Sequence, residues 1–268
     1  MPLNHRRALL TGASGGIGRA AALALSAAGA RLVLSGRNER SLQELAVEIH
    51  GAGGDAEVVR GDLSTREGVE TIVSRTLRTD PQLDLVVNAA GQAHFGAFEQ
   101  TPDEVLEGLM RANVLAPMRL VQAVLPALHG VQGAMIVNVG SIFGSIGFPY
   151  FAAYSASKAA LRGFSEALRR ELADAGVEVL YFAPRYTRTA FNAGAAERMA
   201  VALKMNQDSP QDVARQLVEA IAWRARERYL GWPERAFVRL NGLFPRLVDA
   251  ALAKQSTRMR RYALQHLP

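Results

Sequence analysis

Short apolar runs alternate along the chain with longer stretches in which apolar residues recur every three or four positions. The short runs are typical of buried β-strands, and the longer stretches are typical of α-helices. The predicted strands cover residues 7–11, 31–35, 56–60, 83–87, 134–139, 177–182 and 229–232. Because helical stretches separate the strands, the pattern predicts an α/β fold with a parallel sheet and helices on both faces.

The helical stretches are predicted as a helix ending near residue 28, helices near 41–50 and 66–78, a long region over 102–129, a helix ending near 176 and a helix over 210–227. The long region is expected to be interrupted near Asn113 and Pro117, because an Asn amide competes with the helical backbone bonds. Ser209 and Pro210 are the expected N-cap and first residue of the last helix.

The composition fits one α/β domain with a modest extension. The chain has 268 residues, of which 49% are hydrophobic. It has no cysteine, and its five histidines have no ligand spacing, so we expect no metal site. The polar start of the chain is too short for a signal peptide, and no run of about 18 apolar residues indicates a membrane span. A cytoplasmic protein is therefore expected.

The net charge of +6 is concentrated in one part of the chain. Residues 215–268 carry eleven Lys or Arg against four Asp or Glu, whereas the rest of the chain is almost neutral. These basic residues are interleaved with apolar ones and form no nucleic-acid-binding module, so no nucleic-acid partner is expected.

A glycine-rich turn follows the first predicted strand and opens the first predicted helix. Gly12, Gly16 and Gly18 form the turn, which also contains Ser14 and Ile17. Glycines let the backbone approach a pyrophosphate, and the free N–H groups at the start of a helix favour an anion. The place of the turn between strand and helix favours a dinucleotide site over a merely tight turn.

The ends of the second and third strands bear on the choice of cofactor. Gly36 stands where an acidic side chain would bind the adenosine ribose and select NAD, and Arg37 follows it. A guanidinium binds a 2′-phosphate well, so NADP(H) is favoured over NAD(H). Asp62, which precedes Leu63, is predicted to accept a hydrogen bond from the adenine amino group, and a helix cap is the alternative.

Small and polar residues also follow the later strands. The fourth strand runs into Asn88, Ala89, Ala90 and Gly91, whose small side chains leave room for the nicotinamide-side ribose. Ser141 follows the fifth strand. Ligands of parallel sheets bind beyond the carboxyl ends of the strands, so we expect all these residues to converge there.

Tyr154 and Lys158 lie four positions apart on a predicted helix, which places them on one face. A free tyrosine has a pKa near ~10, and a neighbouring cation lowers it toward the neutral range. The pair is thus a candidate general acid and base, although an ordinary surface Tyr and Lys give the same pattern. The convergence of the other motifs favours the catalytic interpretation.

With these residues in place, the chain resembles the short-chain dehydrogenase/reductase family over about residues 7–230. The matching positions are Thr11, Gly12, Gly16, Gly18, Asp62, Asn88 to Gly91, Asn113, Ser141, Tyr154, Lys158 and the segment from Pro184 to Thr189. The resemblance implies a Rossmann-like doubly wound sheet of seven strands and NAD(P)-dependent chemistry on carbonyls and alcohols.

The resemblance also implies the role of each residue. Tyr154 is the proton donor or acceptor, Lys158 lowers its pKa and holds the nicotinamide ribose, and Ser141 polarises the substrate carbonyl. Asn113 holds a water that links Lys158 to solvent. Pro184, Thr187 and Thr189 contact the cofactor together with the glycine turn.

Two positions depart from the family pattern. Ala89 stands where a second Asn is usual, and that position mostly stabilises the turn. Arg185 stands where glycine is typical. We hypothesise that Arg185 meets an anionic group of the substrate or a cofactor phosphate; the alternative is an arginine whose head reaches water.

Residues 1–232 are expected to form the catalytic domain, with a substrate lid at about 186–208. Residues 233–268 form a basic amphipathic extension, in which Phe237, Leu240, Leu243, Phe244, Leu247 and Leu252 recur at helical spacing. This pattern favours a helix packed over the active site or across a subunit interface, and contact with an anionic membrane surface is the alternative. The aromatic residues Phe143, Phe148, Tyr150 and Tyr186 indicate an apolar pocket for a bulky substrate.

The favoured function is NADPH-dependent reduction of a ketone or aldehyde, or oxidation of a secondary alcohol. A 3-oxoacyl thioester reductase is the second enzyme hypothesis, in which Arg185 and the basic tail meet the phosphates of a carrier. A non-catalytic dinucleotide sensor is the hypothesis from another class. The family resemblance suggests a homodimer or homotetramer packed through residues 102–129 and 151–175.

Overall fold

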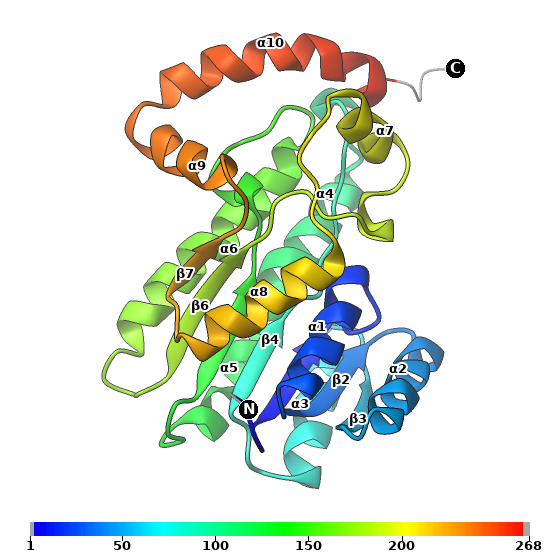
Figure 1. Cartoon of the computed structure of the whole chain (residues 1–268), viewed down its shortest axis with the longest axis vertical. Helices are drawn as coiled ribbons and strands as arrows, with labels where there is room; N and C mark the ends of the chain where they lie inside the picture. The colour runs from blue at the N-terminus through cyan, green and yellow to red at the C-terminus, as the bar shows by residue number, and fades with distance from the viewer. Residues whose placement is uncertain (1–2, 265–268) are drawn as a thin grey trace.

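The computed structural model describes residues 3–264, which fold around a seven-stranded sheet (Figure 1). Residues 1–2 and the last four residues of the predicted extension, 265–268, lie outside the described part. The strands are β1 (Arg7–Thr11), β2 (Arg31–Gly36), β3 (Asp55–Arg60), β4 (Leu85–Asn88), β5 (Met135–Val139), β6 (Glu178–Ala183) and β7 (Glu227–Tyr229). Every neighbouring pair is parallel, which confirms the predicted fold class.

The strand order is β3-β2-β1-β4-β5-β6-β7, and it reverses between β1 and β4. In an open α/β sheet, a crevice forms beyond the carboxyl ends of the strands at such a reversal. Here the last residues of the two strands, Thr11 and Asn88, are direct neighbours. The Thr11 hydroxyl also accepts hydrogen bonds from the N–H groups of Ala89 (3.2 Å) and Ala90 (3.3 Å), which fixes the chain leaving β4.

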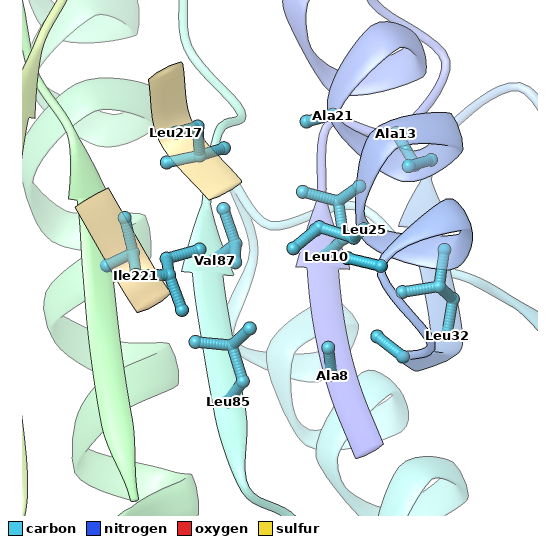
Figure 2. Packing of buried hydrophobic residues seen from close by; sticks show 14 of the residues in the cluster. Ala8, Leu10, Ala13, Ala21, Leu25, Leu32, Leu85, Val87, Leu217 and Ile221 are labelled. Atoms are coloured by element: carbon cyan, nitrogen blue, oxygen red, sulfur yellow. The ribbon is translucent and has the colours of Figure 1, made fainter. Parts of the chain in front are cut away.

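Helices cover both faces of the sheet. One face carries α1 (Gly16–Ala27), α2 (Glu39–Gly51) and α8 (Pro210–Ala222), and the other carries α3 (Arg66–Thr79), α5 (Ala116–Leu128) and α6 (Ala152–Glu171). Leu10 of β1 packs against the first layer, near Leu25 of α1 and Leu217 of α8 (Figure 2). The next side chain along the strand, Leu9, points to the other layer. Burial of both faces explains why the strands are continuous apolar runs in the sequence.

The predicted interruption of the region 102–129 is present. α4 (Asp103–Met110) passes through a π-helical turn, Arg111–Leu115, into α5. Ser209 caps α8 as predicted, since its hydroxyl accepts the N–H of Asp212 at 3.1 Å. No helix within residues 3–264 combines the length and the apolar character that crossing a bilayer requires.

Two boundaries near the end of the sheet differ from the prediction. α8 ends at Ala222 rather than near Glu227, because Arg224 adopts a left-handed φ of 53° that no helix continues. The last strand is therefore Glu227–Tyr229, two residues before the predicted position, and it pairs with β6.

The tail forms two helices instead of one, α9 (Glu234–Leu243) and α10 (Pro245–Ala263). Pro245 lacks an N–H and disfavours a helical conformation of Phe244, so the chain bends there. Figure 1 shows α9 and α10 lying beyond one end of the sheet, where α10 passes over α7 (Ala195–Ala202) of the predicted lid. Met259 of α10 is fully buried in a cluster with Met199 of α7.

Candidate active site

One cavity of about 800 Å³ runs along the carboxyl ends of the strands and ends beneath the tail. Most of the predicted site residues line it: Gly12, Ser14, Gly16, Ile17, Gly18, Arg37, Asp62, Leu63, Ala90, Gly91, Ser141, Tyr154, Lys158, Pro184, Thr187 and Thr189. Asn88 and Asn113 are not among the lining residues. The cavity therefore brings together motifs from the first and last thirds of the chain.

The glycine turn lies against the segment that follows β4. Gly12 has a φ of +66°, and a Cβ there would lie 2.7 Å from the Ala90 Cα atom, so only glycine fits. α1 then begins at Gly16 with no side-chain cap and no acidic residue in its first turn. Its free N–H groups and positive dipole end face the cavity, which suits the pyrophosphate of a dinucleotide.

The segment after β6 covers this turn. A Cβ on Gly16 would overlap the side chain of Thr189, so the two residues are in close contact. Thr187 is buried, and its hydroxyl donates to the carbonyl of Arg185 at 3.0 Å. The segment that is predicted to contact the cofactor therefore packs against the N-terminus of α1.

Arg37 and Asp62 lie at the other end of the cavity, after β2 and β3. The Asp62 carboxylate accepts the N–H of Ser64 at 2.9 Å, and this bond, with a smaller effect of the Arg37 charge, lowers the pKa of Asp62. Asp62 does not cap α3, because Thr65 takes that role by accepting the N–H of Gly68 at 3.0 Å. Asp62 is therefore a charged acceptor that lines the cavity.

Asn88 does not occupy the predicted place in the cofactor site. The Asn88 side-chain amide donates to the side-chain oxygen Oδ1 of Asn138 at 2.8 Å. The Asn138 side-chain amide in turn donates to the Ser165 hydroxyl at 2.9 Å. All three residues are buried. Asn88 therefore joins β4 to β5 and α6 beneath the cavity, and the adjacent Ala90 and Gly91 line the cavity instead.

Asn113 lies in the π-helical turn, and its amide bonds protein groups. It accepts the N–H of Gln92 at 2.8 Å and donates to the Gln92 carbonyl at 2.9 Å and to Ser157 of α6 at 2.9 Å. These bonds fix the loop after Gly91 to the helix that carries Tyr154. The Asn113 side chain therefore orders the site through these bonds.

Tyr154, Lys158 and Ser141 meet in the middle of the cavity, and all three are buried. The Lys158 ammonium lies 5.9 Å from the centre of the Tyr154 ring and donates to the carbonyl of Val139 at 3.0 Å. The Ser141 hydroxyl accepts the N–H of Phe143 at 3.1 Å and is hydrogen-bonded to the Tyr154 phenol. A phenol, a hydroxyl and an ammonium therefore converge on one point.

The pKa of Tyr154 differs from the value that the sequence predicted. Burial raises the pKa of Tyr154 to about 12, and the hydrogen bond with Ser141 opposes this only in part. Burial also lowers the pKa of Lys158 to about 8. Removal from water disfavours both charged forms, an effect that the spacing of the two residues does not reveal. At neutral pH the site holds a protonated phenol beside a cation.

Tyr181 was not identified from the sequence. Its hydroxyl donates to the carbonyl of Ser141 at 3.0 Å and accepts the N–H of Ser141 at 3.3 Å. A Cβ on Gly140 or Gly144 would overlap the Tyr181 side chain, so both glycines are needed for this packing. A single hydroxyl within the otherwise apolar run of β6 was the available signal. Tyr181 fixes the backbone from which Ser141 reaches the cavity.

Comparisons with known proteins agree with this geometry. The model of the short chain dehydrogenase family matches residues 6–200. The chain is 31% identical over 261 residues to Dehydrogenase/reductase SDR family member 7B of Danio rerio, with 92% of this chain and 84% of the relative covered.

The chain belongs to the short-chain dehydrogenase family.

Two solved structures that this chain resembles carry cofactors. A short chain dehydrogenase/reductase from Burkholderia phymatum in complex with NAD superposes with a TM-score of 0.83 at 26% identity, covering 92% of this chain and 96% of the other. A protein described as a putative NAD(P) dependent gluconate 5-dehydrogenase from Beutenbergia cavernae, with bound NADP, superposes with a TM-score of 0.77 at 31% identity. It covers 85% of this chain and 95% of the other.

Arg185, the departure from the short-chain dehydrogenase pattern, lines the cavity and is bound to two carboxylates. Its guanidinium binds both carboxylate oxygens of Asp208 at 3.0 and 2.7 Å and a carboxylate oxygen of Glu234 at 3.0 Å. Asn206 donates to the other Glu234 oxygen at 2.8 Å. These two carboxylates already neutralise the Arg185 cation, which weakens the hypothesis that it meets an anion of the substrate or cofactor, and that hypothesis stays a prediction. Arg185 joins the end of β6, the base of the lid and the start of α9.

The cavity around Tyr154 is apolar, as predicted. The rings of Phe143 and Phe148 stack at 4.4 Å, and Phe151 and Phe191 lie 6.2 and 6.3 Å from the Tyr154 ring. Tyr150, which was expected to line the pocket, packs against Phe95 instead and is not among the lining residues. The tail completes the wall with the side chains of Phe237, Leu240, Leu247, Val248 and Leu252.

Proposed function

We propose that this short-chain dehydrogenase is an NADPH-dependent reductase of a ketone or aldehyde carried on a bulky apolar body. One observation supports this most strongly. A single cavity joins Arg37 and the glycine turn at one end to the buried group of Tyr154, Ser141 and Lys158, and then continues between aromatic rings and the tail. The cavity has a place for a dinucleotide and, beyond it, a place for an apolar substrate.

The residues present fit a nicotinamide dinucleotide. The uncapped start of α1 offers N–H groups to a pyrophosphate, and Asp62 offers an acceptor to an adenine amino group. Arg37 lines the same cavity just after β2, and its guanidinium would suit a 2′-phosphate on the adenosine ribose. When bound, such a cofactor supplies the hydride that the chemistry requires.

The side chains supply the proton and the electrostatics. We assign Tyr154 as the general acid, because burial keeps its phenol protonated at neutral pH. The Ser141 oxygen accepts the N–H of Phe143, and the Ser141 proton, which bonds the Tyr154 phenol, can bond a substrate carbonyl oxygen that lies between the two hydroxyls. The Lys158 cation favours the phenolate that remains once Tyr154 has given its proton away. We assign Asn113 and Tyr181 as positioning residues that hold this group in place.

The structure gives less support to the second enzyme hypothesis. A 3-oxoacyl thioester reductase was argued from Arg185 as a phosphate-binding cation, and Arg185 is bound to Asp208 and Glu234. The predicted cytoplasmic location and the predicted homodimer or homotetramer stay predictions.

The function is tested with the purified chain and a panel of carbonyls, from acetone and cyclohexanone to decalone and long 2-alkanones, each assayed with NADPH and with NADH. We expect kcat/KM to rise by at least a hundredfold from the smallest to the bulkiest ketones, because each buried CH₂ contributes about 0.8 kcal/mol. A protein that binds NADPH but reduces no carbonyl and oxidises no alcohol would be a dinucleotide sensor, and the proposal would fail.

Arg37→Ala tests the cofactor preference. Loss of a charge-assisted bond to the 2′-phosphate is expected to weaken NADPH binding by at least tenfold and to leave NADH binding unchanged. Arg40→Ala is the matched control, since Arg40 is exposed and pairs with Glu44. An equal loss for both cofactors would contradict the assignment of Arg37.

A further inference from the structure

Large apolar side chains are exposed along α9, on the residue that precedes its first turn and at the start of α10. They are Trp232, Phe237, Leu243, Phe244 and Leu247, which are 47–74% exposed. We call these five residues the tail patch. They fall within sixteen consecutive positions, whereas the other large exposed apolar side chains of residues 3–264 are spread over the first 223 positions. Contiguous apolar surface of this kind marks a contact site in a water-soluble fold.

Cations surround the tail patch. Arg235, Arg239 and Arg246 are exposed, and within residues 3–264 none of them has a carboxylate partner at ion-pair distance. Arg235 lies over the ring of Trp232 at 5.7 Å. Glu234, the acidic residue next to Arg235, is bound to Arg185, and Asp249, three positions after Arg246, makes no ion pair with it within residues 3–264. The patch therefore presents apolar side chains together with unneutralised positive charge.

This combination is complementary to an anionic lipid surface. Apolar side chains enter the boundary between headgroups and acyl chains, while arginines remain at the level of the phosphates. A second copy of the chain is a poorer partner, because its tail patch carries the same cations and the two would repel. The other acidic residue of the tail helices, Asp249, leaves the balance clearly positive.

We propose that the α9–α10 corner docks on an anionic lipid surface. This inference goes beyond the proposed function, and lipid binding is measured without any turnover.

The position of the patch also bears on substrate access, and this step rests on the proposed function. Phe237 and Leu247 belong to the tail patch and also line the cavity that contains Tyr154. The apolar end of the cavity therefore lies next to the tail patch. An apolar carbonyl dissolved in the lipid would reach the cavity without crossing water.

Docking is tested by flotation of the purified chain with vesicles of pure phosphatidylcholine and with vesicles that contain 30% phosphatidylglycerol. We expect the chain to float with the anionic vesicles and to remain free with the neutral ones. Raising the salt from about 0.05 to 0.5 M should weaken binding, because salt screens exposed charges. Absence of binding to the anionic vesicles at low salt overturns the proposal.

Two variants separate the apolar contribution from the charged one. Leu243→Ser with Phe244→Ser alters residues that do not line the cavity, and it is expected to lower vesicle binding by at least tenfold. Arg235→Gln, Arg239→Gln and Arg246→Gln together are expected to lower it by about a hundredfold, since each basic residue near an anionic surface contributes about 1 kcal/mol.

Matched controls make the same chemical changes elsewhere. Val47→Ser with Phe98→Ser removes two exposed apolar side chains, and Arg75→Gln, Arg78→Gln and Arg170→Gln removes three exposed charges. Both controls should keep wild-type binding. If the controls lose as much binding as the tail variants, the tail patch is not the docking surface.

Light scattering tests whether a second copy of the chain, rather than a lipid surface, covers the tail patch. If the Leu243→Ser, Phe244→Ser variant splits an oligomer of the wild type and wild-type vesicle binding is absent, the patch is an interface between copies and the lipid proposal is wrong. If activity on every carbonyl is absent but the vesicle results are as expected, docking stands and the proposed function fails.

Discussion

At the scale of single residues, burial decides the chemistry of the site. The spacing of Tyr154 and Lys158 identified the pair. It predicted a lowered pKa for Tyr154, whereas burial raises that pKa. The pKa values depend on how deeply the fold buries the two side chains, and segments that are distant in the sequence produce that burial. Asn88 shows the same limit, because its partner Asn138 lies fifty residues further along the chain.

Lys158 is predicted to reduce the stability of the protein at neutral pH. Its pKa falls from 10.5 to about 8 on folding, so the unfolded chain holds an extra proton between these values and stability rises with pH through this window. Below pH 8 the buried charge costs about 3 kcal/mol. Lys158→Met should remove this cost of the buried charge. The variant also loses the hydrogen bond to Val139, which offsets about 1 kcal/mol of the gain in stability.

Urea denaturation checks this prediction. We expect Lys158→Met to be inactive but more stable than wild type by about 2 kcal/mol at pH 7, with a smaller difference at pH 9.5. Lys254→Met, at an exposed position of α10, should leave the free energy of unfolding unchanged at both pH 7 and pH 9.5. A variant that is less stable at pH 7, with a difference independent of pH, would contradict the account.

At the scale of elements, the sequence located the strands well because buried parallel strands are apolar runs. The last strand differed most, since it begins two residues and ends three residues before the predicted span, and its position depends on where α8 stops at Arg224. The catalytic motifs could also be recognised in the sequence, because the residues of each motif have a fixed spacing. The partners of Arg185 were not, since they lie 23 and 49 residues away on other elements.

Arg185 is predicted to hold the lid and the tail together over the cavity. Arg185→Ala leaves two half-buried carboxylates unpaired and should destabilise the protein by about 2 kcal/mol. Protease cleavage in the lid and tail should become faster, and KM for bulky ketones should rise, while NADPH affinity stays unchanged.

Two further variants test whether Arg185 acts through its carboxylate partners. Adding Asp208→Asn and Glu234→Gln to Arg185→Ala should restore part of the stability, because no unpaired charge remains. Arg215→Ala, which removes an exposed arginine with two carboxylate partners, should have little effect. If Arg185→Ala leaves cleavage and KM as in the wild type, Arg185 does not hold the tail.

At the scale of the whole molecule, the tail lines the cavity of the candidate active site. Val248 packs with Ile142 beside Ser141, Asn241 donates to the carbonyl of Ser145 at 2.9 Å, and Met259 is buried against the lid. The tail helices therefore line the cavity that contains Tyr154 within one chain, and their packing across a subunit interface stays a prediction. The bend at Phe244 and the surface it exposes were not predicted, because the spacing of apolar residues continues across it.

Met259 is predicted to keep the tail closed over the lid. Met259→Ala removes a fully buried side chain and should destabilise the contact by about 2–4 kcal/mol. Hydrogen exchange should then accelerate in α7 and α10 and remain unchanged in the sheet. Equal acceleration throughout the sheet would mean that the tail and the domain unfold as one unit.

The central claim is that the Tyr154 phenol gives the proton to the carbonyl oxygen. The most direct measurement compares Tyr154→Phe with wild type in NADPH binding and in single-turnover ketone reduction. The account predicts unchanged NADPH affinity and a reduction rate lower by a factor of about 10²–10⁴. A variant that binds NADPH normally and reduces the ketone at the wild-type rate would contradict it.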